Sequence, residues 1–515
     1  MSLARRVRLG ALASLGSQVV VTAAQVLLVP LFLAAWGGEL YGEWLTLAAA
    51  VGYAAVADLG LSTYVVNRLT TARVRGDQRE YLEVLHSALA FTLTVGVLVL
   101  AGVCALAWCL PFERWFGFVQ TGASGARWTV ALIALQVASA IPRGLVLGLY
   151  RTIEEYPRGV LIANGQRLGA FAATALALVA GGGPASVAAA QLLPLFAALL
   201  WVLVDLRRRH APIRLGVRHR VRGLALSFLR PSLHFFAVQA SLVLVLQGST
   251  TIVGLISGVG AVAVFASLRT LANLVRQVAN TLSNALWPEL TALVAAERYA
   301  ELRRVHRSAV KGLWALSLAA AASLALAGED LFELWTGGRL ACDRLVLGAF
   351  LVHLVLQAPW TASSYVLLAS NQHQSLARRQ LLAGVLGLGL GAWFALTLGP
   401  AGLVLGLSCA ELLLCARFVP RAVVAMTGDD WRGFRDRVLL RGAILCGGVA
   451  LVVRALTPGL ASLDPGARIL AAGVIGPATT LALALVLFLD EDERRQLRRI
   501  LSWGARRASA SPEAS

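Results

Sequence analysis

Apolar segments of about 20 residues or more, separated by short polar intervals, recur along almost the whole chain. A helix needs about 20 apolar residues to cross the hydrocarbon core of a bilayer, so this pattern predicts membrane-spanning helices. No polar interval between them is long enough to form a core of its own. We expect an all-α polytopic membrane protein with about fourteen transmembrane helices, near residues 9–35, 41–66, 82–110, 127–150, 158–180, 185–206, 231–257, 260–287, 308–328, 344–369, 379–398, 401–423, 437–457 and 468–490.

Arginine is concentrated in every second interval between these segments. The intervals "RVRGDQRE" and "RRRHAPIRLGVRHRVR" lie on the same predicted side as the N-terminus, whereas "GGEL", "GGGPA", "SGVG" and "LGP" lie on the other side and contain no basic residue. Cytoplasmic loops of membrane proteins are enriched in Arg and Lys. We therefore expect a multi-pass protein of the bacterial cytoplasmic (inner) membrane, with both termini in the cytoplasm.

The composition agrees with this interpretation and removes a competing one. The sequence has 515 residues, of which 58% are hydrophobic and 14% charged, with a formal net charge of +19. In a soluble protein such an excess of basic residues would point to nucleic acid, but the distribution of arginine among the loops accounts for it here. No nucleic acid is expected as a partner. The six cysteines form no C-x-x-C pair, so no metal site and no disulfide framework is expected.

The sequence also predicts two similar halves. "WGGELYGEW" follows the first apolar segment, and "SGVGAVAVF" follows the first apolar segment after the longest basic interval, about 220 residues later. Each would be a short turn between two long helices. We expect an N-terminal six-helix bundle (1–206), a basic cytoplasmic linker (207–230), a C-terminal six-helix bundle (231–423), an extra helix pair (424–490) and a cytoplasmic tail (491–515).

One basic interval has the pattern of an amphipathic helix. In "ELTALVAAERYAELRRVHRSAV", Leu293, Tyr299, Leu302 and Val305 fall near one face and the arginines fall elsewhere. Two interpretations are open. The segment is either a helix that lies on the membrane against anionic headgroups, or a basic loop with no further role.

Charged side chains at membrane depth are costly, and they mark either structural pairs or hydrated paths. Six lie within the predicted spans: the carboxylates Asp58 and Glu411, and the arginines Arg143, Arg167, Arg269 and Arg276. Gln247 and Asn280 are polar candidates for the same region. The arginines outnumber the carboxylates by four to two, so they cannot all be neutralised within the protein.

A water-filled cavity of net positive charge between the two halves would account for this excess, and its natural occupant is an anion. The planar guanidinium group matches the oxygens of a phosphate better than an ammonium group does. The four arginines are therefore predicted to bind the substrate in a cationic lumen. Asp58 and Glu411 are expected to be lumen or gating carboxylates, and Gln247 and Asn280 polar lumen residues.

Several kinds of chemistry lack a sequence signal. There is no P-loop and no outward loop large enough for a catalytic domain, so transport without catalysis is expected. The acidic runs "GDDW" and "DEDERR" have no converging metal ligands and are interpreted as ordinary surface charge. No cofactor is expected.

The segment "LLVPLFLAAWGGELYGEWLTLAAAVGYAAVADLGLSTYVVNRLTTARVRGDQREY" closely resembles the N-terminal region of polysaccharide-type flippases, which act on O-antigen, capsule or exopolysaccharide. These belong to the multidrug/oligosaccharidyl-lipid/polysaccharide (MOP) exporter superfamily. The matching elements are Pro30, the turn G-x-x-x-Y-G-x-W that starts at Gly37, D-L-G-L-S from Asp58 to Ser62, and the loop "RVRGDQREY". "LWPELTALVAAERYAELRR" is similar to the equivalent part of the second half. The resemblance covers the whole chain in topology and the first hundred residues in motif.

The resemblance implies two six-helix bundles around a central cavity that opens alternately to each side. The implied substrate is an undecaprenyl-pyrophosphate-linked oligosaccharide, moved from the cytoplasmic to the periplasmic leaflet. An ion gradient or the membrane potential would drive it, and a polysaccharide polymerase and chain-length proteins would be partners beside the membrane lipids. Many relatives carry an acidic residue midway along helix 7, where this sequence has "LVLQGSTTIVG" with Gln247, so the coupling ion is open.

Two hypotheses for Asp58 follow. Its carboxylate either pairs transiently with an arginine such as Arg143 or Arg276, for which the substrate pyrophosphate competes, or forms a permanent tie between helices. Gly60 is expected to allow close helix packing. Competing functions are a flippase of lipid-linked peptidoglycan precursors and a multidrug exporter, whose cationic drugs a cluster of arginines disfavours. A membrane-embedded glycosyltransferase would need a catalytic carboxylate in a large aqueous loop, and the sequence has none.

Overall fold

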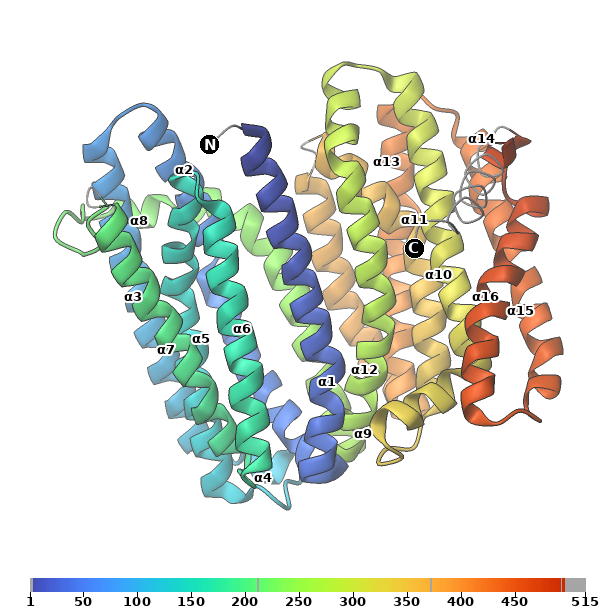
Figure 1. Ribbon diagram of the computed structural model, residues 1–515, viewed down its shortest axis with the longest axis horizontal. Helices are drawn as coiled ribbons and strands as arrows, with labels where there is room; N and C mark the ends of the chain where they lie inside the picture. The colour runs from blue at the N-terminus through green and yellow to red at the C-terminus, as the bar shows by residue number, and fades with distance from the viewer. Residues whose placement is uncertain (1–2, 211–212, 371–372, 492, 496–515) are drawn as a thin grey trace, which may run out of the picture. The chain divides into compact units, whose positions relative to one another are not determined.

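The computed structural model describes residues 3–210, 213–370, 373–491 and 493–495, and within these ranges it contains helices and turns but no β-strand (Figure 1). The all-α fold class predicted from the sequence is therefore confirmed. The elements are, in chain order, α1 (Leu3–Gly52), the 3₁₀ helix η1 (Tyr53–Asp58), α2 (Leu61–Val74), α3 (Gln78–Cys109), α4 (Phe112–Trp115), α5 (Gly122–Thr152), α6 (Tyr156–Val179), α7 (Pro184–Arg209), α8 (Leu224–Ser227), α9 (Leu229–Ala295), α10 (Tyr299–Thr336), α11 (Arg344–Ala369), α12 (His373–Glu411), the π-helical turn η2 (Leu412–Ala416), α13 (Phe418–Met426), α14 (Trp431–Phe434), the π-helical turn η3 (Arg435–Leu440), α15 (Arg441–Leu460) and α16 (Pro465–Leu487).

A glycine with left-handed backbone divides the first helix into a hairpin. α1 has 50 residues, and a straight helix of that length would be more than twice the ~30 Å thickness of the bilayer core. Gly37 breaks it with φ 70° and ψ −174°. The ring centroids of Phe32 and Trp44 lie only 6.0 Å apart, although twelve residues separate them. The chain therefore folds back at Gly37.

Two further helices fold back in the same way. Gly258 breaks α9 with φ 82°, and Gly399 breaks α12 with φ 57°. These glycines lie in the predicted turns "SGVG" and "LGP", as Gly37 lies in "GGEL", and the turn "GGGPA" contains Gly181 with φ 74°. Glycine adopts this conformation without the steric cost that a side chain brings. The positions of the four turns are confirmed, and Gly258 follows Gly37 by about 220 residues, as the internal repeat predicts.

The described residues contain ten helical segments that are long and apolar enough to cross a membrane. Three of the ten contain Gly37, Gly258 or Gly399 and so have two arms each, and α6 is a further long helix outside the ten. Each of the fourteen predicted spans has a counterpart among these arms and helices, while the number of crossings stays a prediction. The chain is a multi-pass membrane protein.

The chain divides into two compact units. Unit 1 comprises Met1–Thr270, Trp335–Ala341 and Gln380–Gly406, and unit 2 comprises Leu271–Leu334, Cys342–Arg379 and Leu407–Ser515. Residues 231–270 therefore belong to unit 1, although the sequence predicts them to be part of the second bundle. The five-part division of the chain stays a prediction.

Within unit 1, α5 packs against α2, α3 and α7, and α6 packs against α1 and α7, so that these long helices lie side by side (Figure 1). Gly148 brings α5 close to α2, because a Cβ at this position would lie 2.3 Å from Val66. The buried core near this contact contains Leu61, Val65, Leu69, Tyr81, Leu85, Leu145, Leu149, Leu206 and Phe228.

Within unit 2, α10, α11, α15 and α16 share one core, formed by Trp314, Leu318, Ala322, Ala358, Leu445, Val449, Ala484 and Phe488. The basic amphipathic segment belongs to this unit and forms a tight helical hairpin, since α9 ends at Ala295 and α10 begins at Tyr299. Leu293 and Leu302 are 2% and 0% exposed. These two side chains are therefore packed inside the protein, whereas Tyr299 is 37% exposed. Both interpretations of the segment stay open.

The hairpins at Gly37 and Gly258 contact each other within unit 1. A Cβ at Gly42 would lie 1.9 Å from the carbonyl oxygen of Val259, and one at Gly260 would lie 2.6 Å from the carboxylate of Glu39. The neighbouring Glu43 is 1% exposed. Its carboxylate accepts hydrogen bonds from three consecutive backbone N–H groups, those of Val119, Gln120 and Thr121, at 2.7–2.9 Å. The turn of the first hairpin is thereby fixed to the start of α5.

We expect Gly42→Ala to destabilise the protein by about 1–3 kcal/mol, because the new methyl group overlaps a backbone oxygen that cannot rotate away. The measurement is the melting temperature of the detergent-solubilised protein, followed by fluorescence-detected size exclusion. Gly102→Ala in α3 is the matched control, since a Cβ at this position would have no atom within 4 Å. Equal melting temperatures for the two variants would show that the hairpins do not contact each other as described.

Candidate functional site

Asp58 lies at a break in the second predicted span. The 3₁₀ helix η1 ends at Asp58, Leu59 and Gly60 adopt left-handed backbone with φ 52° and 68°, and α2 begins at Leu61. The continuous helix predicted from 41 to 66 is therefore wrong. A leucine in the left-handed region is strained. Broken helices at membrane depth form the binding sites of many transporters.

The carboxylate of Asp58 caps the helix that follows the break. Ser62 on α2 donates its hydroxyl to Oδ1 over 2.6 Å. A carboxylate is favoured beside the free N–H groups at a helix N-terminus. In the described part of the chain no ion pair joins Asp58 to an arginine, so the permanent tie to an arginine is absent from this structure. The transient pair with Arg143 or Arg276 stays a prediction.

Gly60 has a conformational role at this break. Its φ of 68° belongs to the left-handed region, which an L side chain adopts only at a cost. Gly144 and Gly148 on α5 lie close to α2, since a Cβ would lie 3.4 Å from Ser62 Oγ and 2.3 Å from Val66, respectively. The cap of the broken helix therefore lies directly against the turn of α5 that carries Arg143. The close helix packing expected at Gly60 itself stays a prediction.

Two of the predicted arginines are brought together in unit 1. Arg143 on α5 donates to Oε1 of Gln166 on α6. Arg167, the next residue on α6, donates to the hydroxyl of Ser17 on α1 over 2.7 Å and to Oδ1 of Asn164 over 3.1 Å. All of these acceptors are neutral. No carboxylate forms an ion pair with either arginine among the described residues, so three helices gather two positive charges without a counter-charge.

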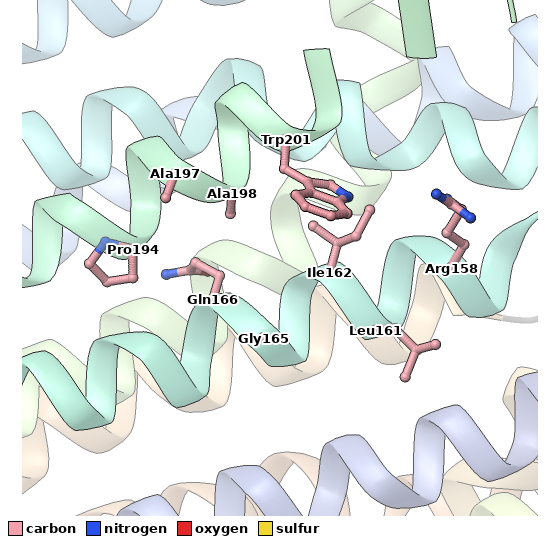
Figure 2. A pocket seen from close by; sticks show the side chains of 9 residues that line it. All are labelled: Arg158, Leu161, Ile162, Gly165, Gln166, Pro194, Ala197, Ala198 and Trp201. Atoms are coloured by element: carbon pink, nitrogen blue, oxygen red, sulfur yellow. The ribbon is translucent and has the colours of Figure 1, made fainter. Parts of the chain in front are cut away.

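A groove of about 520 Å³ runs between α6 and α7 beside this cluster (Figure 2). Figure 2 shows Arg158 toward one end of the groove and Gln166 toward the other. Eight residues on one helix separate them, or about 12 Å. The walls between them are almost entirely apolar and contain Leu161, Ile162, Gly165, Pro194, Ala197, Ala198 and Trp201. Gln166 therefore connects an apolar groove to the guanidinium of Arg143.

The end of the groove at Arg158 is held by a neutralised cluster. Arg158 donates to both oxygens of Asp205 on α7, over 2.8 and 2.6 Å. Tyr150 on α5 donates its hydroxyl to the same carboxylate over 2.6 Å. Such a bidentate pair is geometrically specific and fixes α6 against α7. The charge at this end is therefore part of the framework, unlike the charges of Arg143 and Arg167.

Arg269 has a different environment from the other predicted arginines. From the second arm of α9 it donates to the first arm, to the Leu246 carbonyl over 3.1 Å, to Ser249 Oγ over 2.8 Å and to Thr250 Oγ1 over 3.1 Å. It thereby closes the hairpin around Gly258. The substrate-binding role predicted for Arg269 gains no support from these contacts. Gln247, on the same arm, packs against Gly52, where a Cβ would lie 2.5 Å from its Nε2.

In unit 2, Glu411 lies at the end of α12, where the helix widens into the π-helical turn η2. Such turns are frequent at functional sites. Gln357 on α11 donates to both Glu411 oxygens at 3.2 Å, and Trp360 Nε1 donates at 3.3 Å. One turn back, His353 Nδ1 lies 2.9 Å from the hydroxyl of Ser408. A row of polar groups on α11 thus faces α12.

Arg276 and Asn280 also belong to unit 2. Arg276 is exposed and donates to Oδ1 of Asn273 over 2.6 Å on its own helix, and no ion pair with it is present in the residues that the structure describes. Asn280 accepts from the hydroxyl of Tyr365 over 3.3 Å. The spacing of seven places Arg269 and Arg276 on one helical face, but only Arg269 is bonded across the hairpin.

The interpretation of the acidic runs "GDDW" and "DEDERR" as ordinary surface charge is wrong, because three of their carboxylates form ion pairs within the protein. Asp490 and Glu493 each lie 2.8 Å from Nζ of Lys311, which is 2% exposed. Although partial burial opposes ionisation of Asp490, the hydrogen bond from Lys311 holds the pKa of that carboxyl below its usual value. Asp429 pairs with Arg307 over 2.6 Å. Sequence reasoning missed these pairs because the partners are more than a hundred residues apart.

Comparison with known proteins identifies the fold. The lipid II flippase MurJ in an inward closed conformation matches with a TM-score of 0.66 and 12% identity, over 93% of this chain and 98% of that chain. A multidrug resistance MATE family transporter of the MOP superfamily matches in its inward-facing conformation with a TM-score of 0.64 and 16% identity, over 81% of this chain and 98% of that chain. A multidrug resistance MATE family transporter in an outward-facing conformation matches with a TM-score of 0.56 and 17% identity, over 82% of this chain and 95% of that chain. No family model and no curated protein matches the sequence.

The contrast between Arg269 and Arg276 gives a paired prediction. We expect Arg269→Ala to lower the stability of the solubilised protein by about 1.5–3 kcal/mol or more, because the hydroxyl and carbonyl groups of the facing arm lose a charged donor. Arg276→Ala should change the melting temperature little, since its hydrogen bond is confined to one exposed turn. A melting curve for each variant checks this, and similar losses for both would contradict the assignment of Arg269 to the framework.

Proposed function

We propose that this chain, which has the fold of the MOP-superfamily transporters, is a flippase for an undecaprenyl-pyrophosphate-linked oligosaccharide. It would move the lipid-linked sugar from the cytoplasmic to the periplasmic leaflet by alternating access, for the synthesis of a surface polysaccharide. The termini would lie in the cytoplasm, because the arginine-rich loops lie on their side of the membrane.

The observation that carries this proposal is the pair of arginines on α5 and α6. Gln166 is the acceptor of Arg143, and Ser17 and Asn164 are the acceptors of Arg167. A guanidinium has five N–H donors, so each group keeps donors beyond those that these bonds use. A pyrophosphate offers several charged oxygens that match this geometry. A cationic drug would be repelled by the same two charges, which disfavours the multidrug exporter.

The groove between α6 and α7 supports an amphiphilic substrate. Its walls are apolar, and Gln166 lies both in its lining and in the hydrogen bond with Arg143. The pyrophosphate would bind at Arg143 and Arg167, and the isoprenoid units nearest to it would lie in the groove. The remainder of the lipid would stay in the bilayer, so no free energy would be needed to remove it from the hydrocarbon core.

An ion gradient or the membrane potential would drive the cycle, and no cofactor is proposed. Glu411, at the π-helical turn and bonded to Gln357 and Trp360, is our candidate for the carboxylate that senses the coupling ion. Asp58 would pair with an arginine in another state of the cycle. A polysaccharide polymerase and chain-length proteins would act on the delivered product.

A flippase of lipid-linked peptidoglycan precursors is the second candidate. It is favoured by the match to the lipid II flippase, which extends over 93% of this chain, compared with 81% for the MATE transporter. Both candidates would use the arginines in the same way, since both cargoes join a polyprenyl lipid to sugar through pyrophosphate. They differ in the group attached to the pyrophosphate.

Deletion of this protein should cause lipid-linked oligosaccharide to accumulate in the cytoplasmic leaflet, measured by extraction and by its protection from a periplasmic glycosidase. Arg143→Gln should reduce complementation at least about tenfold, because a buried charge-assisted bond to phosphate is lost. Arg143→Lys should restore it partly. Arg151→Gln, an exposed position on the same helix, is the control. Accumulation of a peptidoglycan precursor instead would favour the second candidate, and no accumulation of either would overturn the proposal.

Asp58→Asn separates charge from capping. Asparagine caps a helix about as well as aspartate, so the hydrogen bond from the Ser62 hydroxyl is kept and the protein level should be unchanged. Transport should fall by at least about tenfold if the carboxylate must pair with an arginine during the cycle. The assay is complementation of the deletion strain, with membrane protein level measured in parallel. Full transport by this variant would leave Asp58 with a capping role alone.

A further inference from the structure

The segment that follows α7 is docked on the surface of α3. His86 on α3 accepts from the backbone N–H of His219 at Nδ1 over 3.0 Å, so its Nε2 carries the proton and donates to the carbonyl of Arg214 over 2.5 Å. Ser87 accepts from the backbone N–H of Val221 over 2.9 Å. Ile213 is 3% exposed and anchors the start of the segment. Residues 213–228 thus follow a defined path, and we call them the docked linker.

Two arginines flank the anchored residue of the docked linker. Arg220 and Arg222 lie on either side of Val221, and all three side chains are exposed. In the described part of the chain, neither guanidinium group forms an ion pair or a hydrogen bond with the protein. The backbone bond to Ser87 therefore holds two unneutralised charges against the side of α3.

A pocket of about 200 Å³ lies between the docked linker and α3. Its lining is mostly apolar, and Arg220 and Arg222 are its two charged residues. Below it on α3, Val97 and Leu98 are each 65% exposed, which continues the apolar surface. The lining residues are Ser87, Ala90, Phe91, Thr94, Arg220, Val221, Arg222 and Ala225.

The length of α3 places this pocket at the edge of the membrane. Trp108, 47% exposed near the far end of α3, stacks edge-on with the exposed Trp128 at a centroid distance of 6.0 Å. Exposed tryptophans mark the membrane interface. About 20 residues span the ~30 Å core, so counting back from Trp108 places the opposite interface near Ala88. This is one residue from Ser87, on the side with the arginine-rich loops.

We propose that this pocket binds an anionic phospholipid of the cytoplasmic leaflet. The phosphate lies between Arg220 and Arg222, and the start of an acyl chain lies against Phe91 and continues along the exposed face of α3. Charge complementarity selects an anionic headgroup, since two arginines at the interface attract negative lipid. The mostly apolar lining selects a lipid over a soluble phosphate. The site is separate from Arg143 and the groove of Figure 2, and it does not depend on the proposed transport activity.

The test is native mass spectrometry of the full-length protein purified in detergent and titrated with phosphatidylglycerol or with phosphatidylcholine. The wild type should retain one phosphatidylglycerol that phosphatidylcholine does not displace at equal concentration. The double variant Arg220→Gln/Arg222→Gln should bind it at least about tenfold more weakly, as expected for two arginines at an anionic interface. Arg218→Gln, on the same docked linker but outside the pocket lining, should bind as the wild type does.

Further variants separate the sources of binding. Arg220→Lys/Arg222→Lys should retain most of the preference for phosphatidylglycerol, and Phe91→Ala should weaken both lipids. Undiminished phosphatidylglycerol binding by the glutamine double variant would overturn the proposal. An equal loss in Arg218→Gln would also overturn it, because the attraction would then come from diffuse charge. Melting temperatures of all variants confirm that folded proteins are compared, and the lysine variant serves if the glutamine double variant does not fold.

Discussion

An arginine inside a membrane has five N–H donors and a charge, and the source of its partners decides its role. Arg269 finds acceptors on the facing arm of its own hairpin, at the Leu246 carbonyl and at two hydroxyl groups. It therefore stabilises the framework. Arg143 and Arg167 find only neutral side chains, on neighbouring helices and, for Arg167, also on its own helix. No carboxylate among the described residues neutralises their charges, and the proposed binding site depends on this difference.

The hairpin that Arg269 closes is the one that the first hairpin contacts. Gly42 leaves room for the Val259 carbonyl, and the buried Glu43 beside it accepts three backbone N–H groups at the start of α5. The turn residues thereby position α5, the helix that carries Arg143. A buried carboxylate with a full set of N–H donors needs no cation. The acidic residue in the turn is accordingly structural, although it lies in the motif that resembles the flippase family.

The sequence predicts the hairpins well because their cause is local. A turn between two membrane helices needs a residue that tolerates positive φ, and Gly37, Gly258 and Gly399 each lie in a short interval without basic residues. The break after Asp58 has no such signal. Leu59 is apolar and adopts a strained left-handed conformation. Hydropathy alone therefore predicts a continuous span across this break.

The predicted site residues show the same limit. Arg269 and Arg276 share a helical face, and the sequence assigned both to the lumen. What distinguishes them is the arm of α9 that folds back at Gly258, because it brings Ser249 and Thr250 to Arg269. Periodicity describes one helix at a time and does not include the partner across a turn. Depth and charge could be inferred from the sequence, whereas the assignment of each charge to framework or ligand required the fold.

The identity of the cations adds a final argument. The chain has a single lysine, Lys311, and its compact ammonium group is enclosed by Asp490 and Glu493 at 2.8 Å. The compact charge of a lysine is sufficient where two carboxylates neutralise a buried cation. Four of the arginines that form no ion pair in the described residues lie instead at two depths, Arg143 and Arg167 within the span and Arg220 and Arg222 beside the interface. A planar fork of donors suits phosphate at both depths. The docked linker would then hold a resident lipid by the same chemistry that the candidate site uses for its cargo.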